Sequence, residues 1–284
     1  MSDVDIRLES IHLYPVKSCA GTAPSRAVLA ETGFDLDREW MVVDANGVFV
    51  TQRELPRMAL VQTALKGDEL VLRAPGMLAL HVAVDRIESR AEVEIWGQRV
   101  AAYDMGPLCA QWFTDFLGRP FRLARFDPDA ARHADRRWTG ELDATAAFQD
   151  AFPLLVASTA SLAEVNRRLS LAGATPVTLA RFRPNLVLSG LDAHGEDHLD
   201  QIVFAGDGGA VRLKLVKPCA RCPIADVDPE RGEAGHAVGD VLAQYRADPR
   251  VGGALTFGMN AVIVEGIGRT LAAGMDGSAT IAFA

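Results

Sequence analysis

This sequence of 284 residues has no basic run and no long apolar run. Its formal net charge is −8 and its pI is about 5.3. A nucleic-acid partner is held by a cationic surface that displaces counterions, so we expect no general nucleic-acid binding. Because no stretch of about 18 apolar residues occurs, we expect neither a bilayer-spanning helix nor a membrane partner.

Cysteine is also scarce. The four cysteines, at positions 19, 109, 219 and 222, are too few and too scattered for a disulfide scaffold. Residues 1–5 are acidic and polar, and they lack the cationic start and apolar stretch of a signal peptide. We therefore expect reduced thiols and a cytoplasmic location.

Several common catalytic and phosphate-binding signatures are missing as well. The sequence has no P-loop, no Gly-x-Gly-x-x-Gly after a strand pattern and no Gly-x-Ser-x-Gly nucleophile elbow. His194 and His198 flank acidic residues in a polar segment, where solvated histidines are more common than metal ligands. The usual nucleotide-binding and serine-hydrolase classes are therefore not indicated.

Short strand patterns separated by turn signals fill the first hundred residues. Asn46-Gly47, Pro75-Gly76 and Gly97-Gln98 each lie between two extended runs, and Asn-Gly is the strongest short hairpin signal. Short strands joined by tight turns are typical of a small barrel or sandwich and not of a βαβ sheet. The first part of the chain is therefore predicted to be β-rich.

Helical patterns are fewer. A proline opens a helix predicted over residues 107–117, and Gly118 follows it. Residues 127–147 are polar and aperiodic, which predicts a loop at a domain boundary. A second helix is expected to begin with Ser161 and Glu164 in capping-box register. These patterns together indicate an α+β protein in which β-structure dominates.

Strict alternation over residues 211–215 predicts a half-buried strand that leads into Cys219-Ala220-Arg221-Cys222. The two cysteines fit several chemistries. Half of a tetrahedral zinc site would need two further ligands, which are hard to find in the sequence. A thioredoxin-like pair would need a βαβ context, against which Pro223 argues. A single thiolate ligand for a soft metal fits the cationic neighbours Lys217 and Arg221, and two structural cysteines are the plain alternative.

Cations near the predicted strand edges form a second pattern. Only four of the 29 basic residues are lysines, and Lys17 and Lys217 each lie two residues before a cysteine. Lys17-Ser18, Arg38 and Arg183-Pro184-Asn185 each combine a cation with hydrogen-bonding groups, as recognition of a phosphate and a heterocycle requires. Taken singly, each is more often a surface ion pair or a turn.

Ordered segments of the chain match one protein family. They are Tyr14-Pro15-Val16-Lys17-Ser18-Cys19-Ala20-Gly21, Asp37-Arg38-Glu39-Trp40, Thr51-Gln52-Arg53, Pro56-Arg57-Met58-Ala59-Leu60, Pro153-Leu154-Leu155, Arg181-Phe182-Arg183-Pro184-Asn185, Cys219-Ala220-Arg221-Cys222 and Val227-Asp228-Pro229. The chain resembles MOSC-domain proteins with the accompanying N-terminal β-barrel domain, the group that contains bacterial YcbX and the mitochondrial amidoxime-reducing component. The resemblance covers nearly the whole chain.

The resemblance implies the fold and the site. It implies a β-dominated α+β protein, with an N-terminal β-barrel-like domain over residues 1–126 and a MOSC β-barrel domain with a few peripheral helices over residues 127–284. It implies that Cys222 binds the metal of a molybdenum cofactor (Mo-molybdopterin). The cofactor-binding residues that it implies are Lys17, Ser18, Arg38, Arg183, Asn185 and Cys222. We add Arg221 as a neighbour of Cys222, and Asp150, which precedes the Phe152-Pro153 run. Beyond the resemblance, we expect protons from water or from Asp228, although a carboxylate in an Asp-Pro turn is more often only a turn former.

The resemblance also implies a function. The expected activity is that of a molybdenum-dependent oxidoreductase that reduces N-hydroxylated or N-oxygenated small molecules. Electrons are expected from a separate ferredoxin- or flavoprotein-type donor, because four cysteines at these spacings cannot hold a plant-type [2Fe–2S] cluster. Pyridoxal phosphate is not expected. The alternatives are a carrier of the molybdenum cofactor or of sulfur on Cys222, without turnover of its own, and a zinc-stabilised binding module.

Overall fold

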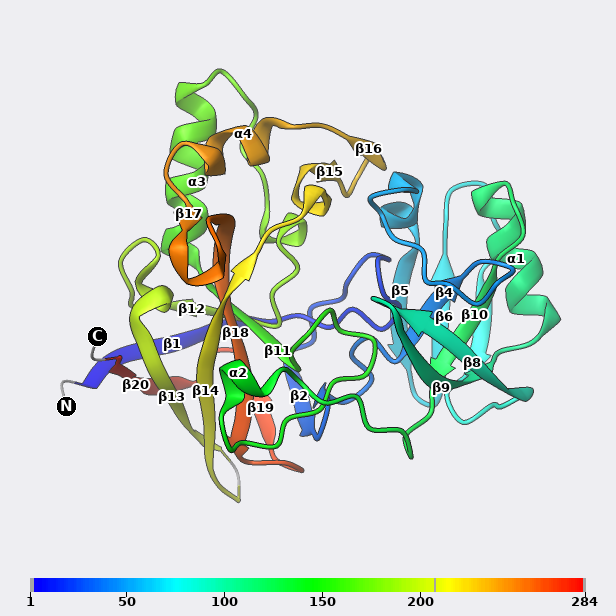
Figure 1. The fold of residues 1–284 in the computed structure, drawn as a ribbon, viewed down its shortest axis with the longest axis horizontal. Helices are drawn as coiled ribbons and strands as arrows, with labels where there is room; N and C mark the ends of the chain where they lie inside the picture. The colour runs from blue at the N-terminus through cyan, green and yellow to red at the C-terminus, as the bar shows by residue number, and fades with distance from the viewer. Residues whose placement is uncertain (1–2, 207, 283–284) are drawn as a thin grey trace.

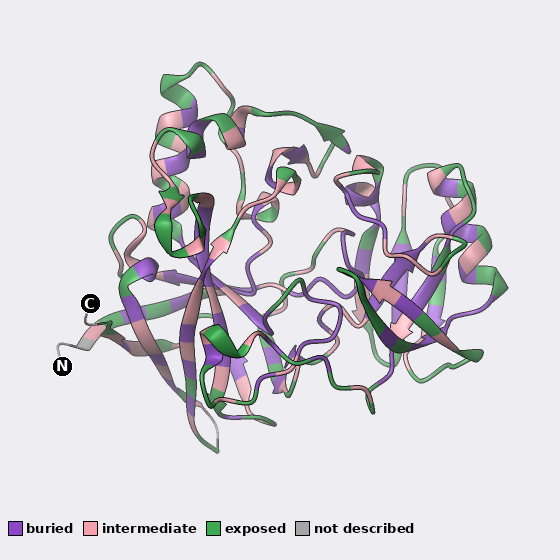
Figure 2. Ribbon diagram, viewed as in Figure 1, coloured by how far each residue is buried: buried purple, intermediate pink, exposed green. Residues whose placement is uncertain are grey.

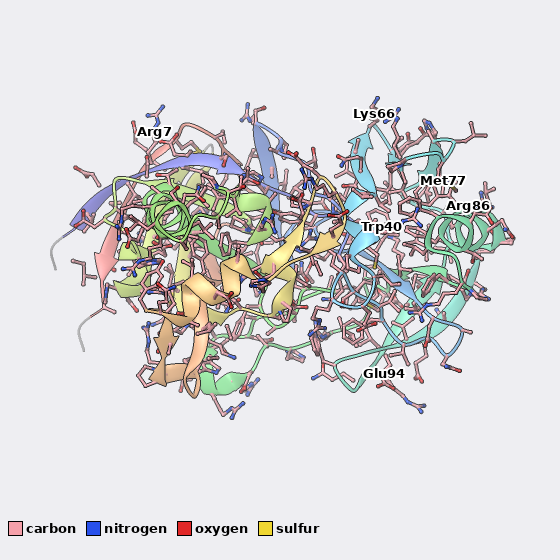
Figure 3. The ribbon with its side chains drawn as sticks, turned by 90° about the horizontal axis from the view of Figure 1, so that it is seen from above. Arg7, Trp40, Lys66, Met77, Arg86 and Glu94 are labelled. Carbon is pink, nitrogen blue, oxygen red and sulfur yellow. The ribbon has the colours of Figure 1, made fainter. Side chains whose placement is uncertain are left out.

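The computed structural model describes residues 3–206 and 208–282. Figure 1 shows two lobes joined by several chain crossings. Buried side chains, purple in Figure 2, concentrate on the strands inside both lobes. Trp40 lies inside the lobe built from the first half of the chain, whereas Lys66 and Arg86 lie at its periphery (Figure 3). The strand-rich architecture confirms the β-dominated α+β class.

The larger lobe is a closed barrel of seven strands. Its order is β11-β12-β1-β20-β13-β14-β18, and a further pairing of β11 with β18 closes it. Closure leaves these strands without a free edge. Only β11 and β12 run parallel, while the other neighbours in the barrel are antiparallel. The barrel strands are β1 (Asp3–Ile11), β11 (Leu154–Ser158), β12 (Leu186–Ser189), β13 (Leu199–Gly206), β14 (Gly209–Ala220), β18 (Ala254–Glu265) and β20 (Asp276–Ile281).

The smaller lobe contains a four-stranded sheet of order β4-β10-β9-β8 and a three-stranded sheet of order β5-β6-β7. Its elements are β4 (Trp40–Val43), the 3-10 helix η1 (Pro56–Leu60), β5 (Gln62–Lys66), β6 (Glu69–Arg73), β7 (Leu80–Ala83), β8 (Ser89–Ile95), β9 (Gln98–Asp104), α1 (Pro107–Leu117) and β10 (Arg122–Phe126). A third sheet of order β19-β2-β3 packs against the barrel, with β2 (Arg26–Ala30), β3 (Gly33–Phe34) and β19 (Thr270–Ala272).

Helices and short strands cover one end of the barrel (Figure 1). They are α3 (Thr159–Leu171), η2 (Leu179–Arg181), η3 (Gly195–His198), η4 (Pro223–Asp226), β15 (Val227–Asp228), β16 (Glu233–Ala234), α4 (Ala237–Ala243), β17 (Ala247–Asp248) and η5 (Pro249–Val251). The short helix α2 (Arg136–Thr139) lies apart from them, beside β14. The helix α2 is one short turn inside the segment predicted as a loop over residues 127–147.

Local signals were read correctly where backbone chemistry decides the outcome. The helix predicted over residues 107–117 is α1, and it ends on Gly118 in a left-handed conformation with φ of 82°. The predicted N-cap of the second helix was wrong. Ser158, not Ser161, caps α3, because its side chain accepts a hydrogen bond from the backbone N–H of Ser161.

The first strand belongs to the barrel although it lies early in the sequence. β1 pairs with β12 on one side and with β20 on the other. The segment expected as an N-terminal domain over residues 1–126 therefore contributes one strand to the larger lobe. The domain boundary between residues 126 and 127 stays a proposal, and β1, which precedes it in the sequence, belongs to the lobe formed mainly by the residues that follow it.

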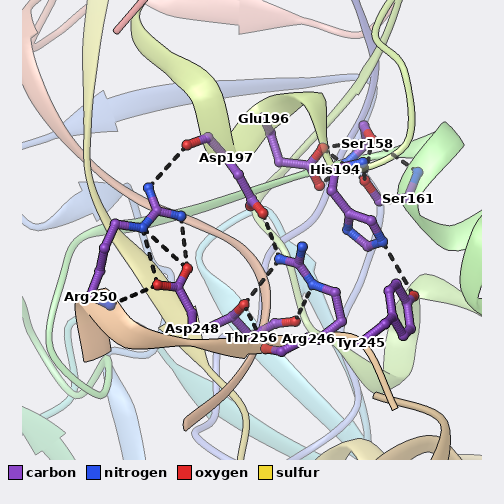
Figure 4. A network of polar contacts seen from close by, with 10 residues as sticks. All are labelled: Ser158, Ser161, His194, Glu196, Asp197, Tyr245, Arg246, Asp248, Arg250 and Thr256. Carbon is purple, nitrogen blue, oxygen red and sulfur yellow. Dashed lines mark hydrogen bonds and ion pairs between the residues drawn. The ribbon is translucent and has the colours of Figure 1, made fainter. Parts of the chain in front are cut away.

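A buried polar network fixes the start of α3 against the barrel (Figure 4). Glu196 is fully buried, and its carboxylate accepts hydrogen bonds from the hydroxyls of Ser158 and Ser161, each at 2.8 Å. The backbone N–H of His194 donates to the Ser161 hydroxyl, and the His194 ring bonds the Tyr245 hydroxyl at 3.2 Å. Because Ser158 ends β11, this network holds a strand whose first two residues, Leu154 and Leu155, line the functional pocket described below.

We expect stability to fall on mild acidification because of His194. Burial, followed by the positive charge of Arg246, lowers the pKa of His194 to about 4. The unfolded chain has a histidine pKa of about 6.5, so it binds the proton first. The contribution of His194 to stability is therefore present above pH 6.5 and is lost as the pH falls toward 4. Urea unfolding between pH 7 and pH 5 measures this loss.

Two asparagine variants isolate this effect. Asn does not titrate and tolerates the left-handed backbone of His194, whose φ is 63°. His194→Asn should lower stability at neutral pH but flatten its decline between pH 7 and 5. His236 is exposed, and its hydrogen bond to Asp240 raises its pKa, so His236→Asn should leave the acid decline in place. If the stability of His194→Asn falls as steeply between pH 7 and 5 as that of the parent, then groups other than His194 cause the acid decline.

Candidate functional site

The main pocket lies between the two lobes and brings the predicted cofactor-binding residues together. The smaller lobe contributes Arg53 and Trp96, and the barrel contributes residues of β11, β14 and β18. All of the predicted cofactor-binding residues line the pocket, namely Lys17, Ser18, Arg38, Asp150, Arg183, Asn185, Arg221 and Cys222. They come from segments up to 205 positions apart in the sequence, so only the tertiary fold could assemble them.

Strained backbone is concentrated around this pocket. Six non-glycine residues in the described chain have a left-handed φ, and four of them line the pocket: Ser18, Arg38, Trp96 and Arg183. Such conformations are costly for residues with a side chain and tend to occur where function requires a fixed geometry. This concentration marks the pocket as a candidate functional site independently of its charge.

Two arginines and a tyrosine form a cationic cluster on one wall. The guanidinium carbons of Arg38 and Arg183 each lie 4.2 Å from the centroid of the Tyr14 ring. Burial raises the pKa of Tyr14 to about 12, so the ring stays neutral. Burial, together with the positive charge of Arg38, lowers the pKa of Arg183 to about 10. The guanidinium of Arg183 is therefore still charged at neutral pH, although burial and the nearby charge of Arg38 both disfavour its protonated form.

The cluster contains buried donors without an acceptor among the described residues. Arg183 donates through Nη1 to the carbonyl of Cys19 at 2.7 Å, but its buried Nη2 has no partner. Arg221 donates to the carbonyl of Phe182 at 2.9 Å and to Cys219 Sγ at 3.1 Å, but its buried Nε has none. Unsatisfied cationic donors are costly, so the wall is suited to an anionic ligand.

Asp37 joins three parts of the site and was not predicted from the sequence. Its carboxylate is fully buried and accepts hydrogen bonds from the Tyr14 backbone at 2.7 Å, Arg38 at 2.5 Å and Asn185 at 3.0 Å. Arg38 in turn donates to the carbonyl of Arg183 at 3.0 Å. Asp37 therefore positions two predicted cofactor-binding residues that come from opposite halves of the chain.

Another part of the pocket carries an ion pair between Lys17 and Asp150. Lys17 Nζ lies 2.5 Å from the Asp150 carboxylate and 2.7 Å from the carbonyl of Phe148. Burial lowers the pKa of Lys17, and the Asp150 charge opposes that change. Burial would raise the pKa of Asp150, but the charge of Lys17 outweighs it and holds that pKa well below the usual range. Asp150 is thus ionised at any pH near neutrality.

A buried arginine fixes the segment that carries Asp150. Arg132 donates three hydrogen bonds to main-chain carbonyls, those of Ala147 at 2.8 Å, Gln149 at 2.6 Å and Asp150 at 2.7 Å. The segment predicted as a boundary loop therefore supplies a rigid support for the site. Sequence reasoning missed Arg132, because an arginine in a polar loop gives no sign of burial.

The two cysteines of the Cys-x-Arg-Cys segment both line the pocket and are partly exposed. Cys19 and Cys109 are buried in the core of the smaller lobe, and burial raises their pKa to about 12 and about 11. Within the described parts of the chain, no three His, Cys, Asp or Glu side chains come together as a metal site. This finding does not fit a tetrahedral zinc site, and Cys222 is left as a candidate single thiolate ligand.

Asp228 lies outside this pocket. It lines a separate depression together with Arg181, and its carboxylate accepts hydrogen bonds from the backbone N–H groups of Glu230 at 2.9 Å and Arg231 at 3.2 Å. Burial would raise the pKa of Asp228, but these hydrogen bonds outweigh it and lower that pKa. The structure therefore places the expected proton source in a turn-forming role, where a strongly acidic carboxyl is a poor proton donor.

Among the other residues that line the pocket, Arg53 and Trp96 were not expected to form part of the site. Arg53 occurs in the Thr51-Gln52-Arg53 segment, and Trp96 forms the tip of the β8–β9 hairpin. The sequence held one signal for each: Arg53 lies in a segment that matches the family, and Trp96 immediately precedes Gly97, where a small polar residue is the usual choice.

Two family models match the chain. A model described as MOSC N-terminal beta barrel domain matches residues 5–120, and one described as MOSC domain matches residues 143–274.

No helix in the described residues is long and apolar enough to cross a bilayer.

Curated relatives match over most of the chain. Mitochondrial amidoxime reducing component 2 of Homo sapiens is 33% identical over 84% of this chain and 72% of its own length. The Bos taurus protein of the same name is 33% identical over 79% of this chain and 67% of its own length. Molybdenum cofactor sulfurase of Homo sapiens is 29% identical over 84% of this chain, but over only 28% of its own length. This chain belongs to the family of MOSC-domain proteins that carry the MOSC N-terminal β-barrel domain.

Proposed function

We propose that this protein is a molybdenum-cofactor-dependent reductase of N-hydroxylated or N-oxygenated small molecules. The observation that carries the proposal is that Cys222 lines the same pocket as two arginines, Arg183 and its sequence neighbour Arg221, that have buried, unsatisfied donors. The names of the relatives support it, because they include amidoxime reducing components and a molybdenum cofactor sulfurase. An association with the molybdenum cofactor is their common element.

The residues present fit such a cofactor. Five cationic side chains line the pocket against one carboxylate, that of Asp150, although the whole chain carries a net charge of −8. A phosphate-bearing dithiolene cofactor is strongly anionic, so it would balance this local excess. The unpartnered Nη2 of Arg183 and Nε of Arg221 are suited to phosphate oxygens. A thiolate is a suitable ligand for a soft metal centre.

We assign roles to the residues on this basis. Cys222 would bind the metal, and Arg38, Arg183 and Arg221 would bind the anionic end of the cofactor. Lys17, Ser18 and Asn185 would orient its ring system through hydrogen bonds, with Asp150 holding the Lys17 ammonium in place. When bound, the cofactor supplies two-electron oxygen-atom chemistry, while the protein supplies binding, orientation and electrostatics.

Proton delivery and electron delivery need other groups. Asp228 is not retained as the proton source, because it lies in a separate depression and is hydrogen-bonded as a turn former. Two electrons per turnover would come from a separate donor protein of ferredoxin or flavoprotein type. The cytoplasmic location expected from the sequence stays a prediction.

The first test is the metal and pterin content of protein purified from a host that makes the cofactor. We expect close to one molybdenum and one pterin per chain, by elemental analysis and by oxidative release of the fluorescent pterin. The loaded protein should then reduce benzamidoxime with an artificial electron donor. Zinc, or no metal and no pterin, would contradict the proposal. Molybdenum and pterin without turnover would favour a carrier of the cofactor or of sulfur.

A further inference from the structure

Trp96 occupies a position that the local fold does not favour. It forms the two-residue loop of the β8–β9 hairpin together with Gly97, between the paired residues Ile95 and Gln98. Both loop residues have positive φ, 53° for Trp96 and 75° for Gly97. A two-residue turn of this kind strongly prefers Asn or Asp before Gly, because a bulky side chain is strained at positive φ. Folding of the hairpin therefore does not explain the tryptophan.

Burial does not explain it either. The Trp96 side chain stays 45% exposed, and its ring contacts Phe49, with ring centroids 4.9 Å apart. A fully buried tryptophan would offset backbone strain through apolar burial, but this ring lies on the wall of the pocket. Because neither the turn nor burial compensates the backbone strain of Trp96, and because its ring lines a pocket, we expect this ring to contact a ligand.

Arg53 extends the same wall. Its guanidinium carbon lies 4.6 Å from the centroid of the Trp96 ring, and its Nε donates to the Thr51 hydroxyl at 3.2 Å. Lys17 and Arg38 are paired with Asp150 and Asp37, but among the described ion pairs none includes Arg53. A guanidinium stacked on an indole keeps its N–H groups free at the edge, where they suit a planar carboxylate.

Arg53 and Trp96 are separate from the cationic cluster assigned to the cofactor. Arg38 and Arg183 lie over the Tyr14 ring, and Arg221 lies over Phe182. Arg53 lies instead on a ring from the smaller lobe. The pocket thus contains buried, unsatisfied donors in one part and, in another, a partly exposed aromatic face with an arginine that forms no ion pair among the described residues. The charge of Arg53 nevertheless acts on Asp150, whose pKa it helps to lower.

We propose that Arg53 and Trp96 form a substrate subsite that selects planar N-hydroxylated compounds carrying a carboxylate. This inference rests on the proposed reductase function and names the substrate class for it. The indole would take the ring of the substrate, and the guanidinium would take the carboxylate through paired hydrogen bonds. The same charge disfavours cationic compounds of similar shape.

The test compares two probes that differ by one charged group, benzamidoxime and 4-carboxybenzamidoxime. Calorimetric titration of the purified protein without electron donor measures binding without turnover. We expect the carboxylate compound to bind about tenfold or more tightly, since a hydrogen bond to a charged group is worth about 1.5–3 kcal/mol. The preference should fall to near unity in Arg53→Gln, and kcat/KM with an artificial donor should follow it.

Two further variants complete the design. Arg57→Gln is the matched control, because Arg57 is an exposed arginine that lies over the Phe116 ring, 4.8 Å from its centroid, and does not line the pocket. It should keep the preference. Trp96→Asn should bind both probes more weakly while its thermal midpoint stays equal or rises, because Asn-Gly suits the turn. A residue with a structural role alone would instead lower the midpoint.

Three results would overturn the subsite. They are equal binding of the two probes by the parent protein, an unchanged preference in Arg53→Gln, and loss of molybdenum and pterin in Arg53→Gln, which would assign Arg53 to the cofactor. The failure of the reductase proposal is distinguishable from these. A protein without cofactor that still prefers the carboxylate probe, through Arg53, would support the subsite and contradict the reductase.

Discussion

A Cys222→Ser variant is expected to lose most of its molybdenum and at least about a hundredfold of its reductase activity. Removing a residue that merely hydrogen-bonds to a metal ligand already costs about 10- to 100-fold in affinity or activity, so losing the ligand itself should cost more. Serine has nearly the same volume, but its hydroxyl stays protonated at neutral pH and is a poor ligand for a soft metal. Molybdenum per chain and turnover of benzamidoxime are the quantities to measure.

The fold should survive this substitution. The Cys222 side chain is only partly buried, and its backbone carbonyl, which accepts a hydrogen bond from Ala225, is unchanged. The thermal midpoint of cofactor-free Cys222→Ser should therefore match that of the parent. Pterin retention should fall less than activity, because Arg38, Arg183 and Arg221 would still bind the anionic end of the cofactor.

Cys219→Ser is the matched control for Cys222→Ser. Cys219 lines the same pocket, three residues away, and its sulfur accepts a hydrogen bond from Arg221. It should keep its molybdenum, because serine can accept the same hydrogen bond. The ligand assignment fails if Cys222→Ser keeps full metal and full activity, or if the losses appear in Cys219→Ser instead.

The features of the fold that could be read from the sequence are those that neighbouring residues decide. A proline at the start and a glycine at the end predicted α1 with its observed bounds. The Pro75-Gly76 signal predicted the β6–β7 hairpin. The Gly97-Gln98 signal predicted the β8–β9 hairpin with its turn one residue too late, because the loop residues are Trp96 and Gly97. Barrel closure was of a different kind, because β1 pairs with β20 across almost the whole chain and no local signal encodes that partner.

The cap of α3 shows how tertiary contacts override a local pattern. Ser161 and Glu164 have capping-box spacing, yet Glu164 pairs with Arg167 and Arg168 on the helix surface. The Ser161 hydroxyl donates to the buried Glu196, 35 positions away. The Ser158 hydroxyl donates to the same carboxylate and also accepts from the Ser161 N–H, so Ser158 is the residue that caps the helix.

The same limit applies to the site. Arg38 and Asn185 were predicted through the family resemblance, but the sequence does not say which of Asp35 and Asp37 is buried. Asp35 is exposed, and Asp37 is fully buried beneath both predicted residues. A supporting residue is recognised by what it contacts, so it becomes evident only in the folded structure.

Asp37→Ala should be the most destabilising single change in the site. It would remove the charge partner of Arg38, whose side chain is only 12% exposed, and leave the Tyr14 N–H and the Asn185 amide without their acceptor. Breaking one side of a buried ion pair costs about 3–5 kcal/mol, because the remaining charge stays buried and uncompensated. Urea unfolding of cofactor-free protein measures this loss without the stabilisation that bound cofactor adds.

Two related variants separate charge from shape. Asp37→Asn keeps an oxygen acceptor for the Tyr14 N–H, but it removes the charge and replaces the oxygen that accepts from Arg38 and Asn185 with an amide NH2. Because one acceptor and the side-chain volume are kept, its loss of stability should be smaller than that of Asp37→Ala. Asp35→Ala, two residues away on the surface, should stay within about 0.5 kcal/mol of the parent, as is usual for exposed positions. Asp37→Ala protein as stable as Asp35→Ala would show that Arg38 finds another partner.

Cofactor content tells whether Asp37 supports the site as well as the fold. Asp37 accepts hydrogen bonds from Arg38 and from Asn185, which directly precedes β12. Its loss should therefore displace Arg38 and Asn185, and both of them line the pocket. Asp37→Asn, which should remain folded, is therefore expected to retain less molybdenum and pterin than Asp35→Ala. If Asp37→Asn retains as much molybdenum and pterin as Asp35→Ala, then the left-handed backbone of Arg38 and its hydrogen bond to the Arg183 carbonyl keep the cationic cluster in place without Asp37.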